Sequence, residues 1–149
     1  MTTKFKHNIT GASGEYYAAA ELSRRGAIAT ITLKNTPNVD VMAASADGKK
    51  SINIQVKTRR TDRARNDWPL SSAPLKKKGS RFFYVFVSLR GEEPPDYYII
   101  PQSVVAGYVE PKHKAWRRAD KKRKSDLRVF KQQDLPRFEK YHNNWDILI

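Results

Sequence analysis

Residues 51–58, with the sequence SINIQVKT, alternate apolar and polar side chains with a period of two. That period is typical of a β-strand, because successive side chains of a strand point to opposite faces of the sheet. One face of this strand is aliphatic, and the other carries Asn53, Gln55 and Lys57. Polar groups that are buried without partners cost free energy, so we expect this second face to meet water, a ligand or a metal ion.

Two further strands precede this segment. Residues 39–44 form an apolar, strand-like run that contains Asp40, and the dipeptide Asp47-Gly48 between the two runs is a strong hairpin signal. We therefore expect residues 39–44 to pair antiparallel with residues 51–58. Alternation over residues 28–33 predicts another strand.

A helix is predicted over residues 14–25, upstream of these strands. Thr10 or Ser13 can cap its start, and Gly26 can end it as a C-terminal cap. Glu15 lies in the first turn of this predicted helix.

The second half of the chain predicts a longer, mixed architecture. Residues 59–80 lack a period and carry turn residues and charge, so we expect a mobile basic loop there. Further elements are expected as follows: a central strand over 81–89, a strand over 96–100, a short helix over 102–107, a part-helical, part-mobile segment over 112–124 and a closing amphipathic helix or turn over 135–149.

The length and composition favour one α/β domain. A chain of 149 residues is long enough for one hydrophobic core, and it has no cysteine, which excludes disulfides, thiolate zinc sites and cysteine catalysis. No apolar run approaches the roughly 20 residues of a membrane span. The polar first residues and the lack of cysteine favour a cytoplasmic location without membrane association.

The positive charge is concentrated in two segments. The formal net charge is +14; residues 57–81 contain nine Lys/Arg and two Asp, and residues 112–131 contain ten Lys/Arg and two Asp. The remainder of the chain is therefore close to neutral. Such concentration is typical of a protein that binds nucleic acid, and the alternative is a charged surface that keeps the protein soluble.

The order of Glu15 in a helix, Asp40 in a strand and Gln55-Val56-Lys57 in the next strand resembles the PD-(D/E)XK nuclease superfamily. This superfamily includes restriction, repair, homing and junction-resolving endonucleases, and the resemblance covers roughly residues 11–58. Residues 83–87, 95–101 and 144–146 also resemble small uncharacterised members. The resemblance implies a restriction-endonuclease-like core: an N-terminal helix, three antiparallel strands and a central mixed sheet flanked by helices.

The resemblance also implies a metal site for Mg²⁺ or Mn²⁺. Asp40 would supply an anionic oxygen, Gln55 its side-chain carbonyl, and Val56 its backbone carbonyl. Glu15 would bind a second metal ion or reach a metal-bound water. Lys57 would orient the attacking water and stabilise the transition state, or act as a base.

Two residues depart from the superfamily pattern. Gln55 stands where the superfamily usually has Asp or Glu, which removes one negative charge and predicts weaker metal affinity. The proline that often directly precedes the acidic residue is displaced to Pro37.

Several basic residues are expected to contact DNA, mainly through phosphates. Trp68 and Trp116 lie in the basic segments, where each either anchors a loop on the core or stacks on a base. None of the three scattered histidines is assigned to a metal. The expected DNA contacts are Thr58, Arg59, Arg60, Lys76, Lys77, Lys78, Arg117, Arg118, Lys121, Lys122, Arg123 and Lys124.

These observations predict a Mg²⁺-dependent DNA endonuclease. Two alternatives remain open: a nuclease-fold module that binds DNA with a weak or inactive site, and a basic RNA-binding protein. A homodimer is expected if the enzyme cuts both strands, because that needs two active sites.

Overall fold

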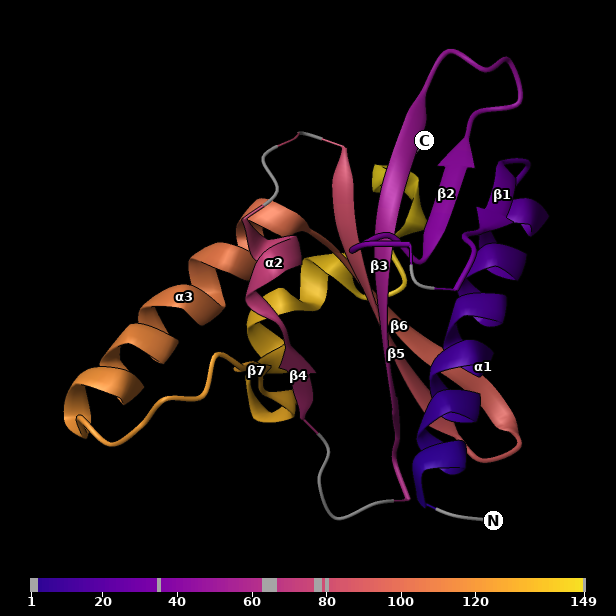
Figure 1. Ribbon diagram of the computed structural model, residues 1–149. Helices are drawn as coiled ribbons and strands as arrows, with labels where there is room; N and C mark the ends of the chain where they lie inside the picture. Colours follow the sequence, from indigo (N-terminus) through magenta and orange to yellow (C-terminus); the bar gives the residue numbers. More distant parts are fainter. Residues whose placement is uncertain (1–2, 35, 63–66, 77–78, 80, 149) are drawn as a thin grey trace.

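A five-stranded mixed sheet forms the centre of the computed structural model, which describes residues 3–34, 36–62, 67–76, 79 and 81–148. The strand order is β1-β2-β3-β5-β6 (Figure 1). β3 pairs with β5 in parallel, and the other neighbours pair antiparallel. The strands are β1 (Ile28–Ile31), β2 (Val41–Ala44), β3 (Ser51–Arg60), β5 (Phe82–Arg90) and β6 (Glu93–Pro101).

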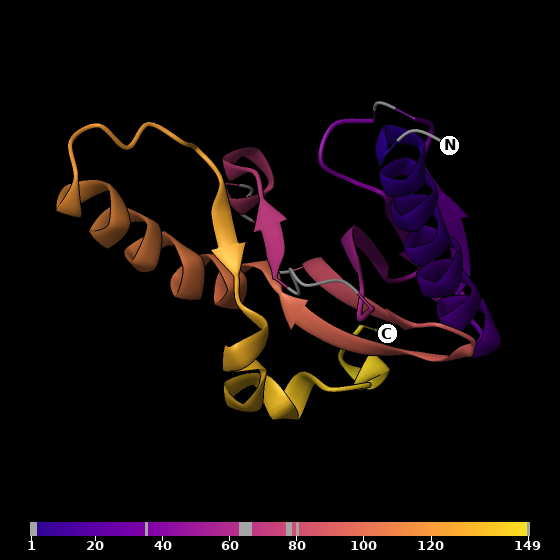
Figure 2. The same cartoon turned by 90° about the horizontal axis from the view of Figure 1, so that it is seen from below.

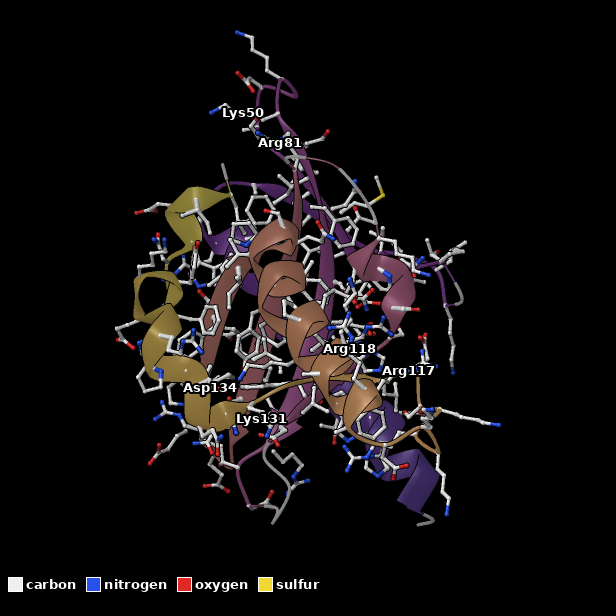
Figure 3. The ribbon with its side chains drawn as sticks, turned by 90° about the vertical axis from the view of Figure 1, so that its left-hand side faces the viewer. Lys50, Arg81, Arg117, Arg118, Lys131 and Asp134 are labelled. Carbon is white, nitrogen blue, oxygen red and sulfur yellow. The ribbon has the colours of Figure 1, made fainter. Side chains whose placement is uncertain are left out.

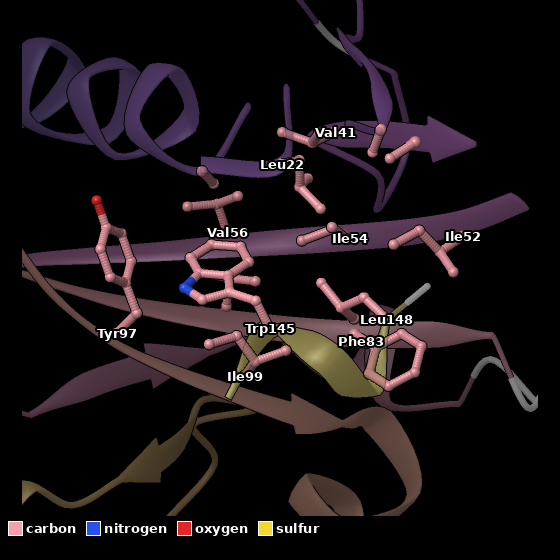
Figure 4. Packing of buried hydrophobic residues seen from close by; sticks show 14 of the residues in the cluster. Leu22, Val41, Ile52, Ile54, Val56, Phe83, Tyr97, Ile99, Trp145 and Leu148 are labelled. Carbon is pink, nitrogen blue, oxygen red and sulfur yellow. The ribbon is translucent and has the colours of Figure 1, made fainter. Parts of the chain in front are cut away.

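One face of the sheet is covered by α1 (Thr3–Arg24) and the C-terminal turn η2 (Trp145–Ile147). The aliphatic side chains of β3 point to this face, as their alternation predicts. They pack against Leu22 of α1 and Trp145 of the C-terminal turn in a hydrophobic cluster (Figure 4).

The other face carries α2 (Ser72–Leu75), α3 (Gln102–Ala119) and the 3₁₀ segment η1 (Gln132–Tyr141). It also carries a second, two-stranded antiparallel sheet made of β4 (Trp68–Leu70) and β7 (Arg128–Phe130). Aromatic rings hold this layer on β5: Phe86 stacks on Phe130 with ring centroids 4.4 Å apart, and Trp68 contacts Phe86 edge-on at 5.2 Å. Trp68 is only 1% exposed, so it anchors the loop on the core.

The predicted α/β class with a mixed central sheet is confirmed. The hairpin is also confirmed, because Ala44 pairs with Ser51 across a turn in which Gly48 has φ of 70°. Gly26, with φ of 87°, ends α1 as predicted. No helix in the described ranges has the length and apolarity that a membrane crossing requires.

The helix boundaries differ from those expected. α1 begins at Thr3 rather than near Gly14, so Thr10 and Ser13 lie inside it and cap nothing; the Ser13 hydroxyl instead donates to the Ile9 carbonyl at 3.0 Å. Hydroxyls that bond back to the preceding turn fit inside a helix, which weakens them as boundary signals. α3 runs on to Ala119, through Pro111.

Residues 59–80 do not form one continuous loop. β3 extends to Arg60, and β4 and α2 lie within the segment, because their buried residues pack on the second face of the sheet. Residues 63–66, 77–78 and 80 lie outside the described residues. The expected mobility of this segment stays a prediction.

Candidate active site

Asp40 directly precedes β2 in the chain and extends the line of that strand opposite β3. Its backbone amide donates to the Ile54 carbonyl at 2.9 Å, which continues the pairing with β3. Its carboxylate oxygen Oδ2 accepts from the Val56 amide at 2.7 Å and from the Gln55 side-chain amide. The Asp40 carboxylate therefore accepts a hydrogen bond from a backbone amide of β3, and this bond fixes Asp40 against that strand.

Gln55 is 8% exposed and lies on the polar face of β3, beside Tyr84 of β5. Its Nε2 donates to Asp40, so its side-chain amide is used as a donor within the site. The expected role of its carbonyl as a metal ligand stays a prediction. The bond explains how a polar side chain is accommodated in a buried position, since a buried amide costs free energy unless it has a partner.

Lys57 lies two residues further along β3, on the same face as Gln55. Burial lowers the pKa of its ammonium group, and the negative charge of Asp40 partly opposes this shift. Because its pKa is lowered, Lys57 loses its proton more readily than an exposed lysine does. The nearby carboxylate of Asp40 stabilises the charged form.

Glu15 reaches the same region from α1. The pKa of its carboxyl is raised first by burial and then by the negative charge of Asp40. The pKa of Asp40 is also raised by burial, although the Val56 amide and Lys57 oppose the shift. A cation bound beside these two carboxyls would stabilise their ionised forms and so reduce the cost that raises their pKa values.

Tyr84 is a polar neighbour that the sequence does not single out. Its hydroxyl is fully buried and has no hydrogen-bond partner among the described residues. The pKa of this hydroxyl is raised by burial and by the charge of Asp40, which places it within electrostatic reach of the site. The available signal was a tyrosine within the apolar run of residues 82–87, next to the strand that carries Gln55 and Lys57.

The donor set fits a hard divalent cation. Asp40 and Glu15 offer anionic oxygens, and Gln55 and the Val56 backbone can offer neutral ones, the ligand types that Mg²⁺ and Mn²⁺ prefer. Within the described ranges no three His, Cys, Asp or Glu side chains cluster as metal ligands. Ligation would therefore draw on amide or backbone oxygens besides the two carboxylates.

A cavity of about 540 Å³ lies at the end of β3, beginning one residue beyond Lys57 with Thr58. Arg59 and Arg60 line it together with His7 and Thr10 of α1 and Pro69 of β4. The cavity thus lies between α1 and the small β4–β7 sheet, which lie on either side of the lower part of β3 in Figure 1.

Two of the expected phosphate contacts in this cavity are engaged within the protein. The Arg59 guanidinium lies over the Trp68 ring at 4.3 Å, and its Nε donates to the Ser88 hydroxyl at 2.9 Å. Arg60 pairs with Asp62 at 2.7 Å. Thr58 turns its hydroxyl oxygen toward Gly14 of α1, where this oxygen is buried, so contact with a phosphate would require the side chain to rotate.

The other expected DNA contacts lie away from Asp40 in the sequence and on other elements. Lys76 is exposed at the end of α2, and Lys77 and Lys78 lie outside the described residues. Arg123 is partly exposed and pairs with Asp120. Exposed positions on α3 and the segment after it are held by Arg117, Arg118, Lys121, Lys122 and Lys124.

Comparison with known proteins identifies the fold. The chain is similar to Hjc of Archaeoglobus fulgidus, a Holliday junction resolvase from an archaeal hyperthermophile, with a TM-score of 0.50, 14% identity, and coverage of 85% of this chain and 87% of that chain. It is also similar to the bacterial homing endonuclease I-Ssp6803I, with a TM-score of 0.55, 16% identity, and coverage of 99% of this chain and 92% of that chain.

No protein-family model and no curated protein sequence matches the chain. At these identities, the two structures show a shared fold. The class defined by the architecture is therefore the restriction-endonuclease-like fold.

Proposed function

We propose that this chain is a DNA endonuclease that hydrolyses phosphodiester bonds with the help of Mg²⁺ or Mn²⁺. The observation that carries the proposal is the grouping of Glu15, Asp40, Gln55 and Lys57, which come from α1, the start of β2 and β3. This grouping lies in a restriction-endonuclease-like fold, and the two similar structures described above are a junction resolvase and a homing endonuclease.

Asp40 and Glu15 would hold the metal ion, with oxygens of Gln55 and the Val56 backbone completing the ligands. A bound divalent metal lowers the pKa of its water and neutralises charge on the phosphate. The buried hydrogen bond from the Val56 amide fixes the Asp40 carboxylate, so this ligand does not have to be ordered when the metal binds.

Lys57 would act on the phosphate itself. Its ammonium group can donate to a non-bridging oxygen where negative charge develops in the transition state. Because burial lowers its pKa, it can also give or take a proton more readily than an exposed lysine. The cavity lined by Arg59 and Arg60 would take the DNA backbone next to the scissile phosphate.

The test is single-turnover cleavage of supercoiled plasmid, a four-way junction and single-stranded DNA, each with Mg²⁺, Mn²⁺ or chelator. Lys57→Ala should reduce cleavage by about a hundredfold. Its affinity for DNA in a gel-shift assay should barely change, because the basic segments supply most of the binding. Lys50→Ala, which removes an exposed lysine just before β3, is the matched control and should cleave normally.

Cleavage that survives Lys57→Ala would contradict the proposed site. Tight binding to DNA without cleavage under any metal would favour a second candidate, a nuclease-fold module that only binds DNA. The bond between Gln55 and Asp40 supports that candidate, since an amide replaces an anionic ligand at this position. Preferential binding of RNA would contradict both.

A further inference from the structure

The C-terminal half of α3 projects beyond the sheet, and the chain returns beside it to β7 (Figures 1 and 2). We call residues 112–131 the basic arm. Its Lys and Arg outnumber its Asp by ten to two, and Arg117 and Arg118 lie on its helical part (Figure 3). Within the described part of the chain, no ion pair is formed by Lys114, Arg117, Arg118, Lys121, Lys122, Lys124 or Lys131.

An apolar groove of about 620 Å³ lies between the two sides of the basic arm. Its lining includes Val109 and Trp116 of α3, and Leu127 and Val129 of the returning segment. Trp116, Leu127 and Val129 are 39%, 54% and 41% exposed. The apolar lining of the groove suits the flat face of an aromatic ring, and the unpaired cations of the arm suit a polyanion.

Trp116 differs from the other two tryptophans of the chain. Trp68 and Trp145 are 1% and 3% exposed and belong to the two hydrophobic clusters. The ring of Trp116 lies 5.8 Å from that of His113, which is buried with its Nε2 2.9 Å from the Ser125 carbonyl oxygen. The indole is thus supported from one side by a fixed residue.

A partly exposed cation covers the indole. The Arg123 guanidinium lies 5.1 Å from the centre of the Trp116 ring, and one of its nitrogens donates to the Trp116 carbonyl at 2.9 Å. An exposed cation–π contact is weaker than the stacking of a nucleobase on an aromatic side chain. A base could therefore displace Arg123 from the ring, and the freed guanidinium could pair with a phosphate of the same strand.

We propose that the groove of the basic arm binds an unpaired base of single-stranded DNA, stacked on Trp116, while the arm's cations hold the flanking phosphates. An aromatic platform in a positively charged groove is the combination by which proteins hold single strands. The site is distant in sequence from Asp40 and would direct the enzyme to DNA with unpaired stretches. The inference rests on the proposed DNA binding but not on cleavage.

The test uses the intrinsic fluorescence of the full chain in the presence of chelator, so that no cleavage occurs. Because Trp116 is the exposed tryptophan, oligo-dT should quench the emission of the wild-type protein, and a blunt duplex should quench it much less. Trp116→Ala should abolish the quenching and weaken oligo-dT binding by about tenfold. Its affinity for the duplex should stay unchanged.

Two further variants separate stacking from charge and from folding. Trp116→Phe should retain most of the affinity for oligo-dT, because the aromatic face is kept. Arg117→Ala should weaken oligo-dT and duplex binding alike and leave the quenching intact. Thermal unfolding of each variant near the wild-type temperature would show that the fold survives.

Several results would overturn the proposal. These are an absence of quenching by oligo-dT, equal losses of oligo-dT and duplex affinity in Trp116→Ala, or a stronger response to oligo-U RNA than to oligo-dT. Displacement of oligo-dT by poly-glutamate at equal charge concentration would show that the groove binds polyanions by charge alone, without stacking of a base. If duplex binding and cleavage persist while quenching fails, only this inference falls; if no DNA binds at all, the proposed function falls with it.

Discussion

At the scale of single residues, Asp40 is held in a position that opposes its own ionisation. Burial raises the pKa of its carboxyl, and the Val56 amide and Lys57 do not fully offset the shift. The folded state therefore binds the proton more tightly than the unfolded state. Ionised Asp40 then lowers stability at neutral pH, and this penalty disappears as the pH falls below the unfolded pKa.

Asp40→Asn should thus abolish cleavage and unfold at the same temperature as the wild type or a higher one at neutral pH. The difference should vanish below a pH of about 3, where the wild-type carboxyl is protonated in both states. The measurement is thermal unfolding by circular dichroism across pH. A clear loss of stability at neutral pH would mean that the bonds from Val56 and Gln55 outweigh the cost of burial.

Asp47→Asn is the matched control, because Asp47 is shifted the other way. The Ser45 hydroxyl and the Lys49 amide hold the pKa of the Asp47 carboxyl below its usual range. Its ionised form therefore stabilises the hairpin turn, and that stability is lost as the pH falls through the folded pKa. The substitution should lower stability at neutral pH and leave cleavage unaffected.

Gln55→Glu should make the site more dependent on metal. The variant loses the donor that faces Asp40 and places a second carboxylate beside it, and like charges in a partly buried site repel. Without metal it should unfold at a lower temperature than the wild type. Mg²⁺ should raise its unfolding temperature more than that of the wild type, because a ligand stabilises the state that binds it.

The measurement for this variant is thermal unfolding and cleavage over a Mg²⁺ titration, and activity at low Mg²⁺ should equal or exceed that of the wild type. Asn53→Asp, which adds the same charge two residues earlier on β3, is the control and should show no added Mg²⁺ response. Equal Mg²⁺ shifts in wild type and Gln55→Glu would argue against Gln55 as a ligand position.

At the scale of secondary-structure elements, α1 and β3 lie in close contact at Gly14. A Cβ at this position would lie 1.8 Å from the Thr58 hydroxyl oxygen and 2.9 Å from its Cβ. The helix can therefore lie this close to the strand only because position 14 has no side chain. This contact also sets the position of Glu15, the next residue of the helix.

Gly14→Ala should lower the free energy of unfolding by about 1–3 kcal/mol, because the helix must move off the strand or Thr58 must leave its rotamer. Gly11→Ala is the control: its Cβ would meet nothing within 4 Å, and alanine in a helix is more stable than glycine by roughly 0.5–1 kcal/mol. Chemical denaturation measures both. A stable Gly14→Ala protein with unchanged cleavage would contradict the close contact.

Sequence patterns predict the longer strands well, and they predict the helix boundaries and the three-residue strands poorly. The alternation in β3 and the Asp47-Gly48 turn specify the hairpin, since each has a direct backbone cause. β4 and β7 have three residues each, too few to show a period, and they form because aromatic rings such as Trp68 and Phe130 are buried together. Such pairing depends on residues far apart in the chain.

The site shows the same division. The order of Glu15, Asp40, Gln55 and Lys57 predicts a common site. Gln55 does contact Asp40, and the charge of Asp40 acts on Glu15 and Lys57, while their shared catalytic role stays a prediction. The sequence does not reveal that Gln55 donates to Asp40 or that Tyr84 lies within reach of its charge, since both depend on side-chain placement across strands. Nor does it separate the buried Trp68 from the exposed Trp116.

At the scale of the whole molecule, the excess positive charge lies in residues 57–81, which include Arg59 and Arg60 of the cavity, and in the basic arm. Both should contact phosphates in a long DNA substrate, so binding should release many counterions. The triple variant Arg117→Ala, Arg118→Ala, Lys121→Ala should reduce the slope of log affinity against log salt by about 2 to 3 for any duplex sequence.

The measurement is fluorescence anisotropy with labelled duplexes over a salt series. Lys34→Ala combined with Lys50→Ala removes exposed charge outside both basic segments and is the control, with a nearly unchanged slope. An unchanged slope in the triple variant would place the arm off the path of the DNA. The expected homodimer stays a prediction, which sedimentation of the protein with and without DNA would test.

The pairing of β4 with β7 has a consequence for how the chain folds. The partner of β4 is a strand that follows α3, far along the chain. Closing this contact therefore costs more chain entropy than closing the hairpin between β2 and β3. The small sheet should therefore form late and open first. The amides of the small sheet should exchange with solvent faster than those of β3 and β5. The basic arm, which this sheet supports, should be able to move as a unit while the nuclease-like core stays folded.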